Sequence, residues 1–484
     1  MKTYDIIIIG AGVVGTAIAH ELSQYVLDIA VLEKEEELSF GVSKSNSGII
    51  HPGTQNPARS LKGRLCVQGN TLIRKIANDC GVEFKEVGEL ILAFHDDDLP
   101  RLTRIKEEAE LLKVPGLRIV KKDWLRKYEP NLSPDVVAAL YAPTAGIISP
   151  YRLVYDLAEN AIANGIEFYT DHPVTSLTKL TDDDFHPNPL FEVTTPRQTF
   201  RTRYVVNAAG LYADEIAAML GMNDFKIIPR KGEEFILDKK KENMTNHLLF
   251  PLPSKTSKGV LVIKTSDGNP MIGPNAVDQT AKDDWSTSEK GMREVVAGVQ
   301  RMVPHINVND IIAYFAGLRP VAGEDFIIRH EEQCQGFINV AGIQSPGLTA
   351  APAIAIYVSD LLRQDHLTLN LKQSFHRYRK KSIHLFSMPF QDTEEKIEEN
   401  PAYGDIVCRC EMVSAKEISD AINRGATTLD GIKFRTRAQA GRCHGGFCTT
   451  RIMKMLAESQ KVPLTQITKK GKGSEIVMED RIDD

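Results

Sequence analysis

The chain has 484 residues, of which 42% are hydrophobic and 25% charged, and its formal net charge at pH 7 is −5. A chain of this length exceeds what one hydrophobic core supports, so we expect two or three domains. The negative net charge argues against a nucleic-acid-binding surface, which would need a basic face. No apolar run approaches the roughly 18 to 20 residues of a membrane span, and the N-terminus lacks the pattern of a signal peptide. We therefore expect no membrane span and a cytoplasmic location.

The first elements follow a strand–helix–strand order. Asp5–Ile9 is a continuous apolar run typical of a buried strand, Gly12–Gln24 shows helical spacing, and Ile29–Leu32 is a second apolar run. Consecutive strands joined by a helix lie parallel, so this order predicts a parallel sheet.

A glycine motif lies between the first strand and the helix. It reads Gly10-Ala-Gly12-Val-Val-Gly15, and Glu33 directly follows the second strand. Such glycines permit a tight turn, close approach of the backbone to a pyrophosphate and close packing of helix on strand, while the helix N-terminus offers N–H groups to phosphates. Glu33 can accept hydrogen bonds from a ribose. The motif predicts a site for an adenosine dinucleotide and does not by itself separate FAD from NAD.

Later segments extend this sheet and add a second domain. Tyr204–Asn207 and Phe337–Val340 are strand-like runs that we expect to return to the first sheet. Between the strands of this sheet lie a charged helix at Arg101–Lys113 and many strand signals over Pro229–Met271. Leu348–Leu362 reads as a long apolar helix. We expect the insertions to form a separate domain.

Two further segments resemble parts of the FAD-dependent oxidoreductases of the D-amino-acid oxidase superfamily. They are Val205–Asp214, which contains Ala-Ala-Gly after a strand, and Ala341–Thr349, which leads into a helix. In that superfamily the first packs near the FAD phosphates, and the second places a helix N-terminus beside the flavin pyrimidine. The resemblance implies FAD as the cofactor. Besides the glycine motif and Glu33, the cofactor-binding residues that it implies are Asn46, Ser47, Gly48, Ala209, Gly210, Gly342, Gly347, Leu348 and Thr349.

The segment Asn46–Gly53 narrows the resemblance to two branches of the superfamily. It reads Asn-Ser-Gly-Ile-Ile-His-Pro-Gly, and it looks like a motif shared by FAD-dependent glycerol-3-phosphate oxidases and dehydrogenases and by L-2-hydroxyglutarate dehydrogenases. The resemblance covers residues 1–365. The glycerol-3-phosphate branch implies His51 as the catalytic base and Lys258, Arg319 and Ser345 as substrate contacts.

These residue types suit the oxidation of a secondary alcohol that carries a phosphate. Hydride removal needs a group that takes the hydroxyl proton, and a neutral imidazole such as His51 does so near physiological pH. A dianionic phosphate needs cationic partners, which Arg319 and Lys258 supply. Gln344 stands where many enzymes of the glycerol-3-phosphate branch carry a lysine. This difference weakens the assignment of a phosphate, so a substrate with a carboxylate remains an alternative. Structural roles also remain possible for these residues. His51 could be a core histidine and Arg319 part of a structural salt bridge. Lys258 could be a surface lysine, and Ser345 could cap the following helix.

Four cysteines gather near the C-terminus as Cys408-Arg-Cys410 and Cys443-His-Gly-Gly-Phe-Cys448. Four thiolates suit a [2Fe–2S] cluster or a structural zinc ion. A pair spaced by one residue beside a pair spaced by four is unusual for zinc modules, which favours iron. The stretch resembles the bacterioferritin-associated-ferredoxin-like [2Fe–2S] domain, which also ends the large subunit of anaerobic glycerol-3-phosphate dehydrogenases. The resemblance implies all four cysteines as ligands.

Short helices are predicted around these cysteines. Ser414–Glu417 has the pattern of a capping box that opens a helix, Gly425 ends that helix, and Thr450–Glu458 reads as a closing helix. Two short helical hairpins would bring both cysteine pairs to one point.

We therefore predict an α/β protein with a Rossmann-like FAD-binding domain, an inserted α+β substrate domain and a small all-α C-terminal module with cysteine ligands. The expected boundaries are 1–80, 145–215 and 315–370 for the FAD-binding domain, 81–144 and 216–314 for the substrate domain, 371–402 for a linker, 403–460 for the [2Fe–2S] domain and 461–484 for a tail.

The resemblance implies oxidation of sn-glycerol 3-phosphate to dihydroxyacetone phosphate by hydride transfer to the flavin. Electrons would leave through the cluster to an acceptor protein or a quinone-linked subunit. Binding to such a partner would also place the enzyme at the membrane surface. One alternative is an L-2-hydroxyglutarate-type 2-hydroxyacid dehydrogenase that uses the same arginine. Another interpretation makes the cysteine module a zinc-stabilised docking domain with no redox role. An oligomer is compatible with each of these.

Overall fold

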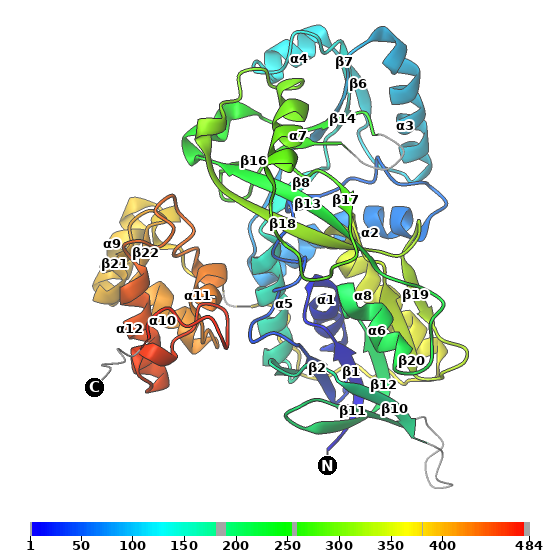
Figure 1. The fold of residues 1–484 in the computed structure, drawn as a ribbon, viewed down its shortest axis with the longest axis vertical. Helices are drawn as coiled ribbons and strands as arrows, with labels where there is room; N and C mark the ends of the chain where they lie inside the picture. The colour runs from blue at the N-terminus through cyan, green and yellow to red at the C-terminus, as the bar shows by residue number, and fades with distance from the viewer. Residues whose placement is uncertain (1, 181–189, 254–258, 380, 479–484) are drawn as a thin grey trace. The chain divides into compact units, whose positions relative to one another are not determined.

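The computed structural model describes residues 2–180, 190–253, 259–379 and 381–478, and Figure 1 shows their elements. The chain divides into two compact units. The first comprises Met1–Leu32 and Ser39–Arg379, and the second comprises Glu33–Leu38 and Lys380–Asp484. Lys258, expected among the substrate contacts, lies outside the described residues.

The first unit begins with the expected strand–helix–strand arrangement. β1 (Thr3–Ile9), α1 (Val13–Leu22) and β2 (Ile29–Leu32) follow one another, and β1 pairs in parallel with β2. On its other side β1 pairs in parallel with β12 (Thr199–Asn207), which pairs in parallel with β20 (Phe337–Ala341). The prediction that the later strands return to the first sheet is confirmed.

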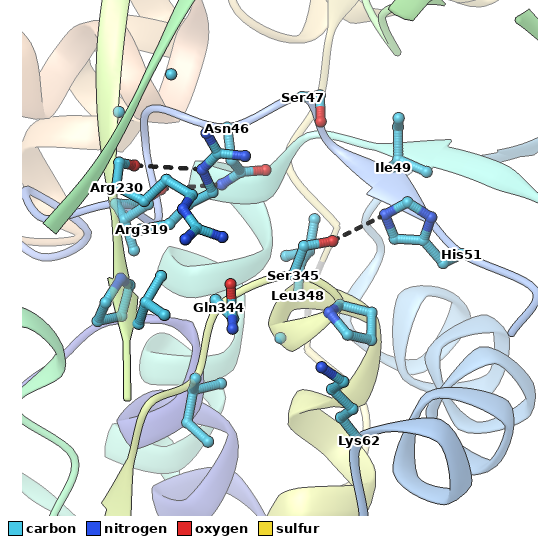
Figure 2. A pocket seen from close by; sticks show the side chains of 18 of the residues that line it. Asn46, Ser47, Ile49, His51, Lys62, Arg230, Arg319, Gln344, Ser345 and Leu348 are labelled. Atoms are coloured by element: carbon cyan, nitrogen blue, oxygen red, sulfur yellow. Dashed lines mark hydrogen bonds between the residues drawn. The ribbon is translucent and has the colours of Figure 1, made fainter. Parts of the chain in front are cut away.

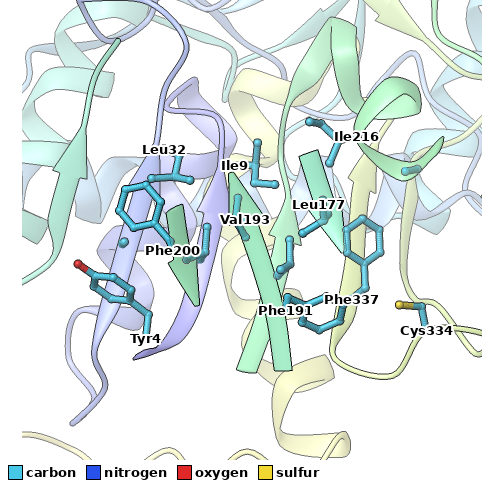
Figure 3. Packing of buried hydrophobic residues seen from close by; sticks show 14 of the residues in the cluster. Tyr4, Ile9, Leu32, Leu177, Phe191, Val193, Phe200, Ile216, Cys334 and Phe337 are labelled. Carbon is cyan, nitrogen blue, oxygen red and sulfur yellow. The ribbon is translucent and has the colours of Figure 1, made fainter. Parts of the chain in front are cut away.

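Further strands bring this sheet to eight. They are β9 (Glu167–Tyr169), β10 (Ser176–Leu180), β11 (Leu190–Thr194) and β19 (Ile327–His330). β10, β11 and the first part of β12 form an antiparallel meander. Figure 3 shows Phe191 and Val193 of this meander packed in one cluster with Ile9 and Phe337 of the parallel strands. Burial of each such side chain contributes roughly 1.5–3 kcal/mol, which holds the meander on the parallel strands.

Helices α1, α2 (Leu61–Cys80), α5 (Pro150–Ala163) and α8 (Gly347–Gln364) pack together beside the parallel strands. α1 contacts α5 and α8, and α8 contacts α2 (Figure 1). A Cβ on Gly69 of α2 would lie 2.0 Å from the carbonyl oxygen of Thr349 in α8. The two helices therefore touch backbone to backbone at this crossing. A short helix, α6 (Ala213–Ala218), follows β12.

A second sheet of nine strands forms the other part of the first unit. Its longest strands, β13 (Ile228–Leu237) and β18 (Ile311–Val321), pair antiparallel with Arg230 opposite Arg319. The other strands are β5 (Glu89–Ala93), β6 (Arg118–Lys121), β7 (Ala138–Ala142), β14 (Leu248–Pro251), β15 (Leu261–Lys264), β16 (Pro270–Gly273) and β17 (Val277–Asp278). The helices that pack on it are α3 (Leu99–Leu111), α4 (Lys122–Tyr128) and α7 (Glu289–Gln300).

A small three-stranded sheet positions the segment of His51. β3 (Ile49–Ile50) and β4 (Phe84–Glu86) both pair antiparallel with β8 (Gly146–Ile148). His51 directly follows β3, so this pairing fixes the backbone just before the imidazole.

The second unit is mostly helical. Its helices are α9 (Phe390–Glu399), α10 (Ala415–Asn423), α11 (Leu429–Thr436) and α12 (Thr449–Gln460). The predicted capping box is confirmed, because the Ser414 side chain accepts the Glu417 N–H and the Glu417 carboxylate accepts the Ser414 N–H at 2.9 Å.

Parts of the second unit differ from the prediction. A hairpin of β21 (Ile406–Cys408) and β22 (Val413–Ser414) precedes α10, so the module is not all-α. α9 lies within the expected linker. Only Thr393 of this helix is buried, so its sequence is mostly charged and lacks the apolar periodicity by which a helix is predicted. Ile467, within the expected tail, is fully buried in the core of the unit. One apolar residue among polar neighbours is too weak a pattern to reveal such packing.

Candidate active site and cysteine centre

The first unit contains a cavity of about 690 Å³ at the carboxyl ends of its parallel strands. Residues that follow β1, β12 and β20 line it, which is where open parallel sheets bind ligands. Strands β13 and β18 of the nine-stranded sheet supply another part of the wall. The predicted site residues that line the cavity are Gly12, Asn46, Ser47, His51, Gly210, Arg319, Ser345, Gly347 and Leu348.

The glycine motif packs tightly against neighbouring backbone. Gly10 has a φ of 103°, and a Cβ there would lie 2.5 Å from the carbonyl oxygen of Ala208. A Cβ on Gly15 would lie 1.9 Å from the carbonyl oxygen of Gly10, so α1 packs directly on the end of β1. The N-cap of α1 is Gly12, and the first turn contains no acidic residue. The positive end of α1 is therefore compatible with a phosphate, and these residues fit the pyrophosphate of a dinucleotide such as FAD.

The turn around Asn46 holds its own shape. Asn46 Nδ2 donates to the carbonyl oxygens of Val42 and Ser43 at 3.1 and 2.8 Å, and its Oδ1 accepts the Gly48 N–H at 2.9 Å. Gly48 has a φ of 67°, and a Cβ there would lie 2.4 Å from the carbonyl oxygen of Ile148. This turn leads the chain into β3 and from there to His51.

Other predicted cofactor residues do not line the cavity within the described chain, namely Gly10, Gly15, Glu33, Gly48, Ala209, Gly342 and Thr349. Glu33 follows β2, and its carboxylate accepts the Glu35 N–H at 3.0 Å. Gly342 follows β20 with a φ of 67°. Thr349 is fully buried, and its Oγ1 accepts the backbone N–H of His51 at 2.9 Å. Thr349 thus supports the segment of His51 from α8.

His51 Nε2 and Ser345 Oγ lie 3.2 Å apart, and Figure 2 shows the two side chains facing each other. The carbonyl oxygen of His51 accepts a hydrogen bond from Asn70 Nδ2 at 3.0 Å, so its backbone is held on both sides. The ring meets Phe250 edge to face, with centroids 6.0 Å apart. The imidazole is buried beside a hydroxyl group at the cavity wall, where it can exchange a proton with a bound alcohol.

Arg230 and Arg319 bring two guanidinium groups to another part of the wall (Figure 2). Arg319 donates to the carbonyl oxygens of Arg230, Lys231 and Asn275, the last at 2.8 Å. Burial lowers the pKa of Arg319 to about 10, which still leaves it cationic at neutral pH. Arg230 forms an ion pair with Asp278 at 2.6 Å. This part of the cavity suits an anionic group.

Glu234 is a buried carboxyl group on the same wall, four residues along β13 from Arg230. It is 2% exposed. Burial raises the pKa of Glu234 to about 7, although the nearby charge of Arg319 acts in the opposite direction. The site therefore holds a carboxyl group that changes charge near neutral pH.

Several described cavity residues are absent from the sequence motifs: Gln55, Asn56, Lys62, Arg230 and Glu234. Lys62 Nζ donates a hydrogen bond to the carbonyl oxygen of Glu324, which also lines the cavity. The alternation of side chains along a strand was the available signal for Arg230 and Glu234, which share one face of β13. The loop residues Gln55 and Asn56 had no comparable signal.

The second unit brings the four predicted cysteine ligands together as two pairs. Cys408, at the end of β21, hydrogen-bonds with Cys448 at the start of α12. Cys410 hydrogen-bonds with Cys443. Cys408 and Cys448 are buried, whereas Cys410 is exposed and Cys443 is partly buried.

Hydrogen bonds favour the thiolate of one cysteine in each pair. The Cys448 thiol, followed by backbone N–H groups, lowers the pKa of Cys408 to about 6 despite its burial. The Cys410 thiol and the N–H groups after Cys443 lower the pKa of Cys443. Hydrogen bonds to these partners raise the pKa of Cys410 and Cys448. Thiolates are the form that binds metal, so the donor set suits an iron–sulfur centre.

Within residues 2–180, 190–253, 259–379 and 381–478, no group of three or more His, Cys, Asp or Glu side chains is arranged to hold a single metal ion. Two separate thiol pairs would supply the four cysteine ligands of a binuclear cluster.

Comparison with known protein families gives two matches. Residues 5–361 match the model of the family described as FAD dependent oxidoreductase, and residues 406–458 match the BFD-like [2Fe-2S] binding domain. The expectations of FAD and a [2Fe–2S] cluster as cofactors, and of a mixed α/β FAD-binding fold, are confirmed by these matches.

Individual relatives agree with this assignment. A glycerol 3-phosphate dehydrogenase from Caloramator mitchellensis is 40% identical over 477 residues, which cover 98% of each chain. The structure of L-alpha-glycerophosphate oxidase from Mycoplasma pneumoniae with FAD bound has a TM-score of 0.73 at 30% identity and covers 78% of this chain and 99% of that one. A mitochondrial L-2-hydroxyglutarate dehydrogenase from Bos taurus is 29% identical and covers 75% of this chain and 89% of its own.

No helix in the described part of the chain has the length and apolar character of a membrane-spanning segment. The chain belongs to the FAD-dependent oxidoreductases and carries a BFD-like [2Fe–2S] binding domain at residues 406–458.

Proposed function

We propose that the protein is a glycerol-3-phosphate dehydrogenase that oxidises sn-glycerol 3-phosphate to dihydroxyacetone phosphate and passes the electrons to a [2Fe–2S] cluster. The observation that carries this proposal is the cavity that contains His51 beside Ser345 together with Arg230 and Arg319. A proton acceptor and an anion-binding group in one cavity are what the oxidation of a phosphorylated alcohol needs. The Caloramator mitchellensis dehydrogenase, which matches both units, supports the same assignment.

His51 acts as the general base. Its Nε2 takes the proton of the C2 hydroxyl as that carbon becomes a carbonyl carbon. FAD, when bound, supplies the acceptor for the hydride that leaves C2, so that one proton and one hydride account for the two hydrogens removed. In the free enzyme the Ser345 hydroxyl stands 3.2 Å from Nε2, and it orients the imidazole toward the place that the substrate hydroxyl takes.

Arg319 and Arg230 bind the phosphate group. Arg319 Nε and Nη2 donate hydrogen bonds to the surrounding backbone carbonyl oxygens, and these bonds fix the orientation of the guanidinium plane. Lys258, which the sequence predicts as a further phosphate contact, stays a proposal because it lies outside the described residues. Charge-assisted contacts to a phosphate contribute roughly 1.5–3 kcal/mol each.

Electrons leave through the cysteine centre. The [2Fe–2S] cluster, when bound to Cys408, Cys410, Cys443 and Cys448, supplies one-electron transfer. The natural acceptor is proposed to be an electron-carrier protein or a quinone-linked subunit, and the enzyme is proposed to work in the cytoplasm.

A 2-hydroxyacid such as L-2-hydroxyglutarate is the second candidate substrate, supported by the 29% identical Bos taurus relative and by the neutral Gln344 at the cavity wall. The test is anaerobic reduction of the bound flavin, followed by its absorbance, with each compound in turn. Bleaching by glycerol 3-phosphate at a lower concentration than by L-2-hydroxyglutarate supports the proposal. The reverse order would replace it with the second candidate.

A further inference from the structure

Two amide side chains in the cavity have hydrogen-bonding atoms that no described residue engages. Within the described residues that line the cavity, the buried side-chain nitrogen and oxygen atoms without a partner are Gln55 Oε1, Gln55 Nε2 and Asn56 Nδ2. Asn56 is only 6% exposed. By contrast, Asn46 on the same wall is engaged at both ends of its amide. Buried polar atoms are normally satisfied, so an unsatisfied set on a cavity wall indicates a ligand that completes it.

The loop that carries both amides is fixed on each side. Before it, the backbone of His51 is held by Thr349 and Asn70. Within it, Thr54 Oγ1 donates to the buried carboxylate of Glu89. After it, the Ser60 N–H donates to the Pro57 carbonyl oxygen at 3.0 Å, at the start of α2. The loop is therefore anchored, and its amides are presented to the cavity by a preorganised backbone.

The chemistry of an amide selects the kind of ligand group. A carboxamide donates and accepts, as a hydroxyl group does, whereas a phosphate or an ionised carboxylate only accepts. Gln55 has its donor and its acceptor both unused. Figure 2 shows Arg230 and Arg319 away from His51, so the anionic end of the substrate has its own partners. Gln55 and Asn56 follow His51 closely in the chain and are suited to a neutral group next to the reacting carbon.

We propose that Gln55 and Asn56 form a subsite for the terminal hydroxyl group of a phosphorylated polyol. This subsite selects a hydroxymethyl group over a carboxylate on the carbon that is oxidised. The inference rests on the proposed function, because it assigns one end of the same substrate. The subsite distinguishes the two substrates by the group that faces Gln55 and Asn56. Glycerol 3-phosphate offers them a hydroxyl group, and a 2-hydroxyacid offers them a carboxylate.

The experiment compares glycerol 3-phosphate with propane-1,2-diol 1-phosphate, which lacks the terminal hydroxyl. The variants are Gln55→Met and Asn56→Leu, which keep the side-chain size and remove the amide. Gln333→Met is the matched control, because Gln333 is an exposed amide in the turn between β19 and β20. Each protein is assayed with both compounds from one holoenzyme preparation, so the ratio of kcat/KM values does not depend on the active fraction. FAD content is measured in parallel.

The wild type is expected to prefer glycerol 3-phosphate, and each cavity variant to lose about tenfold in kcat/KM for it, as removal of a neutral hydrogen bond implies. Values for the deoxy compound should change by less than about twofold, and Gln333→Met should match the wild type. An unchanged ratio in both cavity variants would overturn the subsite, and so would loss of FAD from both, which would assign the amides to the cofactor. A wild type that oxidises neither compound would overturn the proposed function itself.

Discussion

His51 Nε2 and Ser345 Oγ lie 3.2 Å apart although 294 positions separate the two residues in the chain. The pair is formed because β3 ends just before His51 and α8 begins just after Ser345. A proton acceptor and a neighbouring hydroxyl are thus assembled from two segments that are each fixed by their own element.

Replacing the base should abolish most of the turnover. His51→Ala is expected to lower the rate of flavin reduction by roughly 10²–10⁴-fold, since it removes the imidazole that takes the hydroxyl proton. FAD should stay bound, because the contacts of the glycine motif are untouched. Stopped-flow absorbance with glycerol 3-phosphate measures the rate. Normal rates would return His51 to the role of a core histidine.

Arg319→Lys should weaken substrate binding more than it slows the chemical step. A lysine keeps the charge but not the planar fork, so the apparent KM for glycerol 3-phosphate is expected to rise about 10- to 100-fold. Arg293→Lys is the matched control, with a side chain that is 78% exposed. An unchanged KM in Arg319→Lys would remove this residue from the phosphate site.

Glu234 should make stability depend on pH in a defined window. Its pKa is raised from 4.5 to about 7 in the folded protein, so between these values the folded state binds more protons than the unfolded state. The free energy of unfolding should therefore fall as pH rises from about 4.5 to 7. The contribution of Glu234 to this fall is on the order of 3 kcal/mol.

Glu234→Gln should remove that contribution. Urea unfolding at pH 5 and pH 8 is compared between this variant and the wild type, and the variant should gain stability relative to the wild type at pH 8 but not at pH 5. Glu332→Gln, at an exposed position, should show no such difference. A variant whose relative stability is the same at both pH values would show that Glu234 does not titrate in this window.

Removing two cysteines should separate the two redox steps. Cys443→Ser combined with Cys448→Ser is expected to eliminate the visible absorption of the cluster, because one thiol of each pair is lost. Glycerol 3-phosphate should still bleach the flavin, while transfer to a one-electron acceptor dye should collapse. Cys334→Ser, outside the cysteine centre, should keep both activities. A double variant that cannot reduce its flavin would show that the two units do not work independently.

Gly15→Ala should prevent FAD binding. The added methyl would lie 1.9 Å from the carbonyl oxygen of Gly10 and would push α1 away from β1. Gly41→Ala is the control, since a Cβ there meets nothing within 4 Å. The FAD-to-protein absorbance ratio is the measurement, and an unchanged ratio in Gly15→Ala would contradict the proposed packing.

The local patterns of the sequence predicted the parts of the fold that depend on neighbours in the chain. The strand–helix–strand opening and the Ser414–Glu417 capping box are of this kind, because each is decided within a few residues. That His51 and Ser345 belong to one site was implied by a family resemblance and not by their spacing.

The rest of the cavity depends on distant pairing. Arg230 faces Arg319 only through the register of β13 with β18, which no local pattern encodes. Gln55 and Asn56 lie in a loop whose conformation depends on contacts with distant residues. That atoms of their amides lack a partner among the described residues can be seen only in the three-dimensional structure. The burial of Ile467 is a tertiary effect of the same kind.

The backbone contact of Gly69 with Thr349 has a consequence for how this enzyme tolerates mutation. Gly69 carries no chemical group, yet any side chain there would displace α8, and Ser345 and the Thr349 hydroxyl that holds His51 would move with it. In a library of random variants, loss of turnover should therefore recur at Gly69, which is not among the described residues that line the cavity. A search for catalytic positions by activity alone would find this helix crossing as readily as the imidazole.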